Sequence, residues 1–355
     1  LVHHPFRQSS YLDILVLNTW NMRRIHTFLF VVSLITTTAV AQTEPTAGTW
    51  KTWFISSGRD YRLAAPVASK SEIAEVLTAQ KNLDAEGIRQ ITYWNAGSPG
   101  YRFLDVMDKI WMTDTGNIGP LSYMLLNVAT YDATIAAWDT KYAFKRKRPF
   151  EADSRIKVYG VKPESPSYPC EHSVAAGVAV AIFSQYYPRL ADSINRMAQR
   201  LMASRVAAGL AYPEDTRAGF ELGKRIAQKE IEHTKDFTPK NRWDGNKPEG
   251  PGYYKPKFAM WPNAGQSKTV VLTSSSQFRP APPPDFAKDM EELKKFKQTF
   301  SSSANAYYYG AQNSGDDMLD KKVFEHNYHL NPPRAARIYA ISAIGVYDGF
   351  VACWD

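Results

Sequence analysis

Residues 166–187 read PSYPCEHSVAAGVAVAIFSQYY, and they hold both an apolar centre and a polar edge. From residue 173 to 187 the sequence is apolar on nearly every side of a helix and rich in alanine and glycine. A helix of this kind is buried against close neighbours. His172 stands where that helix begins, at a terminus whose free N–H groups and dipole favour an anion. The stretch therefore predicts a buried helix with an anion-compatible first turn.

Apolar residues recur at helical spacing on both sides of this stretch. The expected helices cover residues 70–93, 101–112, 122–138, 190–210 and 215–235. Ser69 and Glu72 are placed to form a capping box at the start of the first of them. Strand-type alternation is hard to find before residue 240. Residues 60–240 are therefore predicted to form an all-α helical bundle, the first of two modules.

The segment 241–284 contains eight prolines and four glycines, which exclude a regular helix. We interpret it as an ordered connector whose aromatic side chains pack on another part of the chain. Helical spacing returns over residues 285–299 and again from residue 333. Residues 285–355 are therefore expected to begin a second bundle that is truncated.

Two nine-residue stretches repeat at an offset of 216 residues. Residues 131–139 read YDATIAAWD and residues 347–355 read YDGFVACWD, and Tyr123 pairs with Tyr339 at the same offset. A repeat at a fixed offset indicates duplicated structural units, with chance similarity of two amphipathic helices as the alternative. The second copy runs to Asp355, so we expect this sequence to be a fragment of a longer reading frame.

The N-terminal part has the pattern of a secretory signal. After Met22, two arginines precede a mostly apolar run over residues 27–38, and Ala39-Val40-Ala41 forms a small-residue cleavage site. We interpret 22–41 as a signal peptide and 1–21 as translated sequence upstream of the true start, with a disordered arm as the alternative. The longest apolar stretch elsewhere has ten residues, too short for a membrane span. We expect an exported protein, secreted or periplasmic, that is not embedded in a membrane.

Composition narrows the class of partner. A net charge of +8 is diffuse, which suits an anionic substrate and argues against nucleic acid. Two cysteines exclude a disulfide scaffold and a cysteine-rich zinc module. A charged fraction of 22% is that of a globular chain. The composition leaves a homo-oligomer open.

Three short elements between residues 141 and 215 carry candidate chemistry. They are Lys141 with Arg148-Pro149, then residues 166–172, then Ser204-Arg205 with Asp215 ten residues after the arginine. Two arginines and a lysine can hold a tetrahedral oxyanion by bidentate and point-charge contacts. A histidine at a helix start can act as general acid toward a leaving group. Each element alone is commonplace, whereas the ordered set on neighbouring helices is specific.

This ordered set resembles the type 2 phosphatidic acid phosphatases and vanadium-dependent haloperoxidases, whose pattern is Lys-x6-Arg-Pro, Pro-Ser-Gly-His and Ser-Arg-x5-His-x3-Asp. The resemblance covers about residues 60–355. It is closest to the soluble, exported branch with two helical bundles, of which the second usually carries the working site. It implies an acid-phosphatase-like phosphoric monoester hydrolase; the alternative is a haloperoxidase with vanadate as cofactor. The implied partner is phosphate or a vanadate-like oxyanion.

The family's roles carry over onto the positions that match. Lys141, Arg148 and Arg205 match its oxyanion-binding cations. His172 matches its acid histidine, and Asp215 matches the aspartate that orients a second histidine. A structural role for His172, bonded to Asp215 or to a backbone carbonyl, is an equal alternative.

Three positions depart from the family pattern. Cys170 replaces a serine, so this oxyanion-contacting position lacks a hydroxyl donor. Glu171 replaces a glycine and places a carboxylate where like charges would repel a phosphate. Ala211 stands where the second histidine belongs, and a methyl group is neither a nucleophile nor a vanadium ligand. We therefore expect this chain alone to be inactive, with a non-catalytic structural or oxyanion-binding half-module as a further alternative.

Other residues are weak substitutes for the missing histidine. His233 lies about six helical turns farther along the chain and would need a fold-back to reach the site. Cys170 could in principle be a thiolate nucleophile, but a small buried cysteine near a helix start is the simpler interpretation. His326 and His329 could share a helix face. Two prolines follow at once, however, and no third ligand stands close by, so a metal pair is not favoured.

Overall fold

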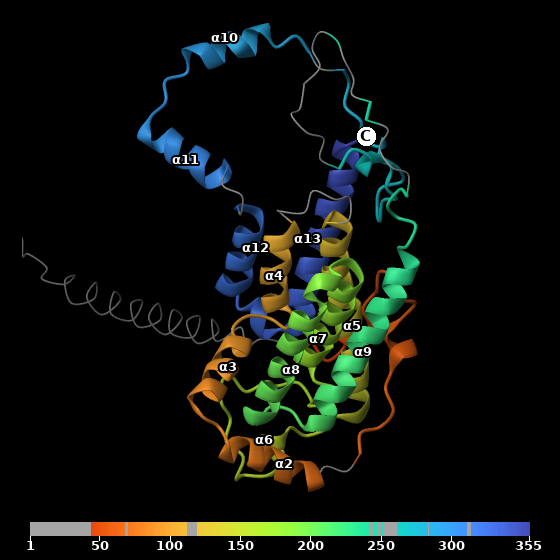
Figure 1. Cartoon of the computed structure of the whole chain (residues 1–355), viewed down its shortest axis with the longest axis vertical. Coiled ribbons are helices and arrows are strands. Elements are labelled where there is room, and N and C mark those ends of the chain that lie inside the picture. Colours follow the sequence, from red (N-terminus) through yellow and green to blue (C-terminus); the bar gives the residue numbers. More distant parts are fainter. Residues whose placement is uncertain are drawn as a thin grey trace, which may run out of the picture. The chain divides into compact units, whose positions relative to one another are not determined.

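The computed structural model describes residues 44–67, 70–111, 119–240, 245–246, 250, 261–282, 284–310 and 314–355 (Figure 1). Throughout these ranges the regular structure is helical, without a strand, which confirms the predicted all-α class. The α-helices are α2 (Lys70–Lys81), α3 (Ala85–Asn95), α4 (Tyr101–Trp111), α5 (Gly119–Phe144), α6 (Pro149–Ala152), α7 (Glu171–Tyr186), α8 (Ala191–Ala207), α9 (Pro213–His233), α10 (Ala287–Lys295), α11 (Phe300–Gly310), α12 (Ser314–Glu325) and α13 (Pro332–Cys353). The predicted signal peptide, 22–41, and the segment 1–21 lie outside the described residues.

Two of the expected helices are wrong in extent. The single helix predicted over 70–93 is interrupted after Lys81, because the Asp84 side chain accepts a hydrogen bond from the Gly87 amide (2.7 Å) and starts α3. The predicted helix 285–299 ends at Lys295, and α11 and α12 follow it without having been predicted. The sequence of α11, FSSSANAYYYG, has no apolar stripe of the kind that periodicity detects.

Glu72, the glutamate of the predicted capping box, bonds other partners in the structure. The Glu72 carboxylate bonds the Arg146 guanidinium (2.6 Å) and the Glu214 amide (2.7 Å). Its predicted partner Ser69 lies outside the described residues. Glu72 therefore fastens α2 to the segment after α5 and to the first turn of α9.

Helix α5 forms the centre of the core, and α4, α7, α9 and α13 pack around it (Figure 1). Helices α7 and α9 cross very closely at two glycines. A Cβ on Gly177 would come 2.0 Å from the Phe220 carbonyl oxygen, and one on Gly223 would come 1.9 Å from that of Val174. This explains the alanine- and glycine-rich composition of α7, because larger side chains would separate the two backbones.

The sequence repeat corresponds to equivalent contacts in α5 and α13. In α5, the Asp132 carboxylate accepts hydrogen bonds from the backbone amides of three consecutive residues, Trp53, Phe54 and Ile55 (2.9–3.2 Å). In α13, the Asp348 carboxylate accepts hydrogen bonds from the amides of Val270, Val271 and Leu272 (2.7–2.9 Å). We call residues 47–62 the first strap and residues 264–279 the second strap. Each strap is anchored to its own helix in the same way.

Further contacts of the two straps also match. Arg62 pairs with Asp139 (2.6 Å), and Arg279 pairs with Asp355 (2.6 Å). The hydroxyls of Tyr131 and Tyr347 donate to the carbonyl oxygens of Lys51 and Lys268. Both straps begin with a short 3-10 helix, at Ala47–Thr49 and Ala264–Gln266, whose glycine lies against the end of the long helix. The duplicated unit thus extends well beyond the nine residues visible in the sequence.

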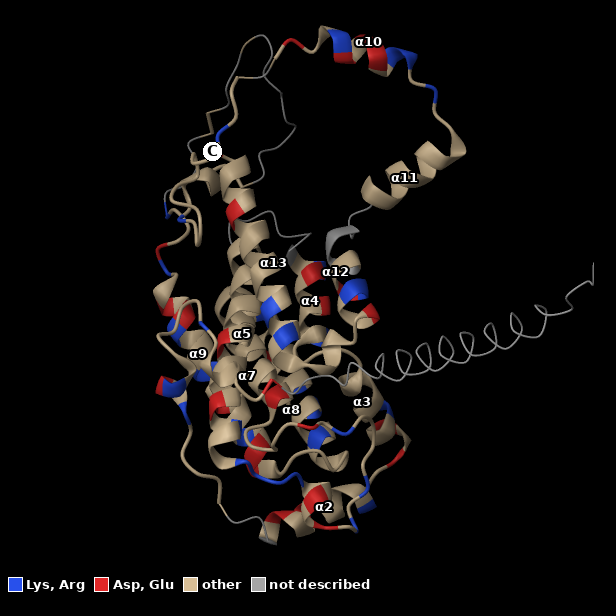
Figure 2. Cartoon of the chain, turned by 180° about the vertical axis from the view of Figure 1, so that it is seen from behind, with Lys and Arg blue, Asp and Glu red and all other residues tan. Residues whose placement is uncertain are grey.

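The order of elements repeats as well. The first strap is followed by α2, α3, α4 and α5, and the second strap is followed by α10, α11, α12 and α13. The second set begins at Ala264, inside the segment 241–284. Helix α10 carries charges of both signs and α11 carries none (Figure 2).

Helix α13 departs from the expectation that no segment outside the N-terminal one approaches a membrane span. An 18-residue window within its 22 residues has a mean hydropathy of 1.2, and 44% of that window is buried. Its interruptions by Arg334, Arg337 and Asp348 hide it from a search for uninterrupted apolar runs. Its counterpart α5 is almost entirely buried in the bundle, which is the behaviour of a core helix.

Candidate anion site

The predicted site residues meet where five helix ends converge. Lys141 lies in the last turn of α5, Arg148 is the N-cap of α6, and Arg205 lies in the last turn of α8. Cys170 is the N-cap of α7, and Asp215 lies in the first turn of α9. Prolines at the first positions of α6 and α9 fix where those helices begin. All five side chains are at most 3% exposed, so the structure brings these predicted residues together in a closed, buried site.

Glu171 lies among the cations of this site. Its Oε2 atom is 2.8 Å from Lys141 Nζ, and its Oε1 atom is 3.3 Å from a terminal nitrogen of Arg148. Burial raises the pKa of the Glu171 carboxyl, but Lys141 and Arg148 outweigh burial and hold it well below its usual value. The carboxylate therefore pairs with the cations that were expected to hold an oxyanion.

The other donors of Lys141 and Arg148 are also engaged within the protein. Lys141 Nζ donates to the carbonyl oxygens of Pro166 (2.5 Å) and Ser167 (3.2 Å). Arg148 donates to the carbonyl oxygens of Ser165 and Leu210, both at 2.8 Å, and to the Ser165 hydroxyl at 3.0 Å. With Glu171 in place, these two cations are satisfied by the chain itself.

Arg205 is less completely paired. One terminal nitrogen of its guanidinium donates to the side-chain oxygen of Asn95, at the end of α3. Its Nε atom is buried without a hydrogen-bond partner. Burial lowers the pKa of Arg205, and the Glu171 charge partly offsets this. Asn95 was not predicted, and nothing in its sequence context distinguishes it from other helix-terminal asparagines.

His172 is mostly buried, with 12% of its side chain exposed, and it is uncharged at neutral pH. Burial, and then the Arg205 charge, lower its pKa to about 4. Its Nδ1 atom lies 3.8 Å from Glu171 Oε1, too far for a hydrogen bond, and has no other partner. A neutral imidazole held this way is poorly suited to donate a proton to a leaving group.

Asp215 bonds groups other than a histidine. Its carboxylate accepts hydrogen bonds from the Ser167 hydroxyl (2.5 Å), the Arg146 guanidinium (2.6 Å) and the Tyr212 amide (3.0 Å). The Tyr212 contact caps the first turn of α9. Asp215 thus stabilises a helix start and an arginine at the point where the family pattern would have it orient the second histidine.

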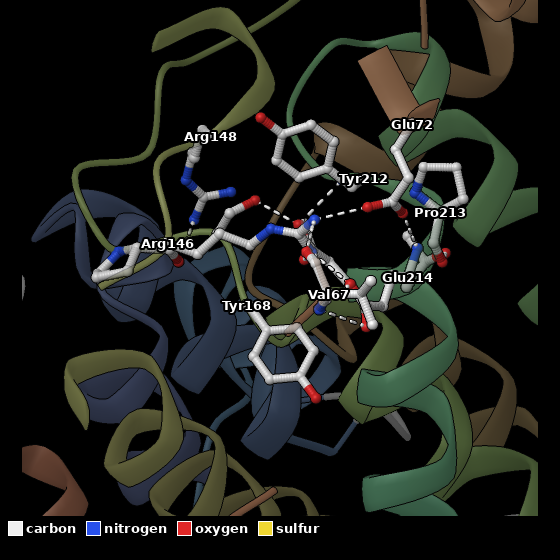
Figure 3. Close-up of polar contacts among 12 residues, drawn as sticks. Val67, Glu72, Arg146, Arg148, Tyr168, Tyr212, Pro213 and Glu214 are labelled. Atoms are coloured by element: carbon white, nitrogen blue, oxygen red, sulfur yellow. Dashed lines mark hydrogen bonds and ion pairs between the residues drawn. The ribbon is translucent and has the colours of Figure 1, made fainter. Parts of the chain in front are cut away.

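Arg146 is the centre of a buried cluster that sequence analysis missed (Figure 3). It contacts the carboxylates of Glu72 (2.6 Å), Glu214 (3.0 Å) and Asp215 (2.6 Å), and its guanidinium lies 4.3 Å from the centre of the Tyr212 ring. We call Glu72, Arg146, Glu214 and Asp215 the Arg146 cluster. In the sequence, Arg146 stands in the run KRKR at 145–148, which looks like an exposed charged segment, so no pattern separates it from its neighbours.

Within the ranges that the structure describes, no other histidine reaches the position of Ala211, which is fully buried. His233 is the last residue of α9 and packs on Phe54, with 5.0 Å between ring centres. His326 follows the end of α12, and His329 lies in a short 3-10 helix. Among the residues that the structure places, no group of three His, Cys, Asp or Glu side chains could hold a metal ion.

The residues present do not fit a bound vanadate. Ala211 offers no atom to ligate the metal, and the Glu171 carboxylate already pairs with Lys141 and Arg148. The same two observations count against a phosphoenzyme formed at this site, since that reaction needs a nucleophile and free oxyanion donors.

Comparison with known proteins places this bundle in a family. No curated protein matches the chain. Among solved structures, a bacterial vanadium-dependent iodoperoxidase is 19% identical with a TM-score of 0.47, covering 53% of this chain and 57% of its own. A transmembrane PAP2-type phosphatidylglycerolphosphate phosphatase from Bacillus subtilis is 18% identical with a TM-score of 0.38, covering 49% of this chain and 89% of its own. This chain thus spans little more than half of the iodoperoxidase.

The family model described as PAP2 superfamily matches residues 119–228, which include α5 to α8, most of α9 and every predicted site residue. The resemblance expected from the motifs is thereby confirmed: residues 119–228 match the PAP2 superfamily model.

Proposed function

We propose that this chain is a non-catalytic, structural half-module of a PAP2 superfamily protein. The observation that carries the proposal is the pairing of Asp215. With Ala211 in place of the second histidine, the aspartate is taken up by Arg146, Ser167 and the start of α9. The chain therefore lacks the nucleophile, and the aspartate that would orient it is bonded to other groups.

Helix α13 exposes a face whose counterpart in α5 is buried, which supports a half-module. Ile341 and Val346 of α13 are 50% and 42% exposed, whereas their counterparts in α5, Leu125 and Thr130, are 0% and 9% exposed. Helix α5 is covered by α7 and α9, and in the described ranges α13 has no equivalent cover. A complementary helical unit would bury this face.

For a longer protein that contains this unit, we propose phosphoric monoester hydrolysis ahead of vanadium-dependent halide oxidation. Phosphate hydrolysis requires fewer special features than peroxide activation at a bound vanadate. The N-terminal pattern from Met22 to Ala41 supports export, and we propose a secreted or periplasmic location.

The test is a turnover assay on purified residues 42–355. A chromogenic phosphomonoester is supplied in one assay, and halide, hydrogen peroxide and vanadate in another. We expect no turnover above buffer in either. Turnover that His172→Ala removes would contradict the proposal, because it would show that the site works without a second histidine.

A further inference from the structure

Glu171 is a buried carboxylate that lies among buried cations. Lys141, Arg148 and Arg205 are all buried, and Glu171 is the carboxylate that pairs with the first two. Asp215, the other nearby acid, is engaged by Arg146. Around Glu171, three buried cations thus face one carboxylate, and a buried cation is costly unless an anion lies close to it.

Several buried polar atoms at the site also lack hydrogen-bond partners. Arg205 Nε, His172 Nδ1 and Ser173 Oγ are buried without hydrogen-bond partners. His172 and Ser173 belong to the same helical turn as Glu171, and the Arg205 and Glu171 charges are close enough to interact. A carboxylate has two oxygens to offer these groups, whereas a tetrahedral oxyanion has four.

We infer that Glu171 is an internal replacement for a small oxyanion, held by Lys141 and Arg148 with Arg205 beside it, and that shortening this side chain opens the same place to free inorganic phosphate. The inference rests on the proposed function, because it takes the unaltered site to be closed and inactive. An attached carboxylate is present at a high effective concentration, so dissolved phosphate does not compete with it in the unaltered protein.

The first experiment compares the unaltered chain with Glu171→Ala in phosphate and in chloride of matched ionic strength. The melting temperature of the unaltered chain should be the same in both. Glu171→Ala leaves the buried Lys141 and Arg148 without their carboxylate, and we expect its melting temperature to fall by about 10 °C in chloride. Added phosphate should restore stability in proportion to the logarithm of its concentration, and calorimetry should detect its binding.

Two control variants separate a vacated site from a general effect of phosphate. Glu171→Gln removes the charge but keeps the space filled, so it should lose stability without recovery in phosphate. Glu214→Ala removes a carboxylate from the Arg146 cluster, and phosphate should not restore it. In the Glu171→Ala background, Arg205→Met should weaken phosphate binding at least tenfold, because it removes one of the three cations.

The inference is overturned if folded Glu171→Ala gains no more from phosphate than the unaltered chain, or if Glu214→Ala gains equally. It is also overturned if Glu171→Ala folds in neither buffer while Glu171→Gln folds, because phosphate then cannot replace the side chain. A Glu171→Ala chain that folds only with phosphate supports it. Turnover by the unaltered chain would instead refute the proposed function, so the two failures are distinguishable.

Discussion

The stability that a buried acid contributes depends on pH, and Glu230 is the clearest case. It is fully buried, and burial together with the neighbouring Asp132 carboxylate raises its pKa well above the usual value near 4.5. The folded chain therefore holds the Glu230 proton more tightly than the unfolded chain. The resulting stability is complete below about pH 4.5 and is lost as pH rises toward the folded pKa.

Glu230→Gln should remove this dependence on pH. We expect the variant and the unaltered chain to have similar free energies of unfolding near pH 5, and the variant to be more stable at pH 8 by at least about 1 kcal/mol, the equivalent of roughly one pKa unit. Urea denaturation at both pH values measures this. Glu232→Gln, at an exposed position on the same helix, is the matched control and should change neither value.

Restoring only the missing histidine should not restore chemistry. Ala211 is fully buried, so Ala211→His inserts an imidazole into filled space and should cost about 1–3 kcal/mol of stability. Asp215 is already bonded to Arg146 and would not orient the new ring. We expect a lower urea midpoint and no phosphatase activity. Ala203→His, at an exposed position of α8, should leave the midpoint nearly unchanged. A stable and active Ala211→His would show that Arg146 releases the aspartate.

Motif spacing predicted the positions of Lys141, Arg148, Arg205 and Asp215 because each is tied to a helix end, and the structure gathers them in one place. It did not predict what they bind. Partners such as Glu72 and Asn95 come from helices far away in sequence, and their choice depends on three-dimensional packing. Spacing also did not reveal that the Glu171 carboxylate pairs with Lys141 and Arg148; the expected repulsion of an oxyanion by this carboxylate stays a prediction.

At the scale of elements, the two straps should respond independently to loss of their anchors. Asp132→Asn replaces a carboxylate that receives hydrogen bonds from the amides of residues 53–55. Hydrogen bonds to a charged group are worth about 1.5–3 kcal/mol, so exchange of these amides should accelerate about tenfold or more. Asp348→Asn should do the same at residues 270–272 only. Mass-spectrometric hydrogen exchange measures both, and equal acceleration in both straps by either variant would contradict independent anchoring.

Helix positions in the first bundle followed from apolar spacing because their buried faces are regular. The break between α2 and α3 was missed because it depends on a local cap, in which Asp84 competes with helix continuation. The second strap was missed because its serines and the prolines on either side of it resemble a connector, although three of its amides are bonded by one aspartate. Such tertiary anchoring has no local signature in the sequence.

At the scale of the whole molecule, cleavage of the chain at α10 should not separate the parts on either side. The lysines of α10 and of the residues that follow it are exposed. Helix α13 shares the main apolar core with α5. Brief trypsin treatment should therefore cut between residues 288 and 297 and leave fragments that elute together from a gel-filtration column but separate in denaturing gels. A free C-terminal fragment would show that the α5–α13 contact is weak.

Because each strap is anchored by one aspartate, one Arg–Asp ion pair and one tyrosine hydroxyl, the folding chain has two similar docking places. A strap that docks on the wrong long helix satisfies the same backbone amides, so mispairing is a kinetic trap inherent in the duplication. Side-chain bulk favours correct pairing, since the first strap carries Trp53 and Phe54 where the second carries two valines, Val270 and Val271. Making the two straps more alike would slow refolding while leaving the native contacts intact.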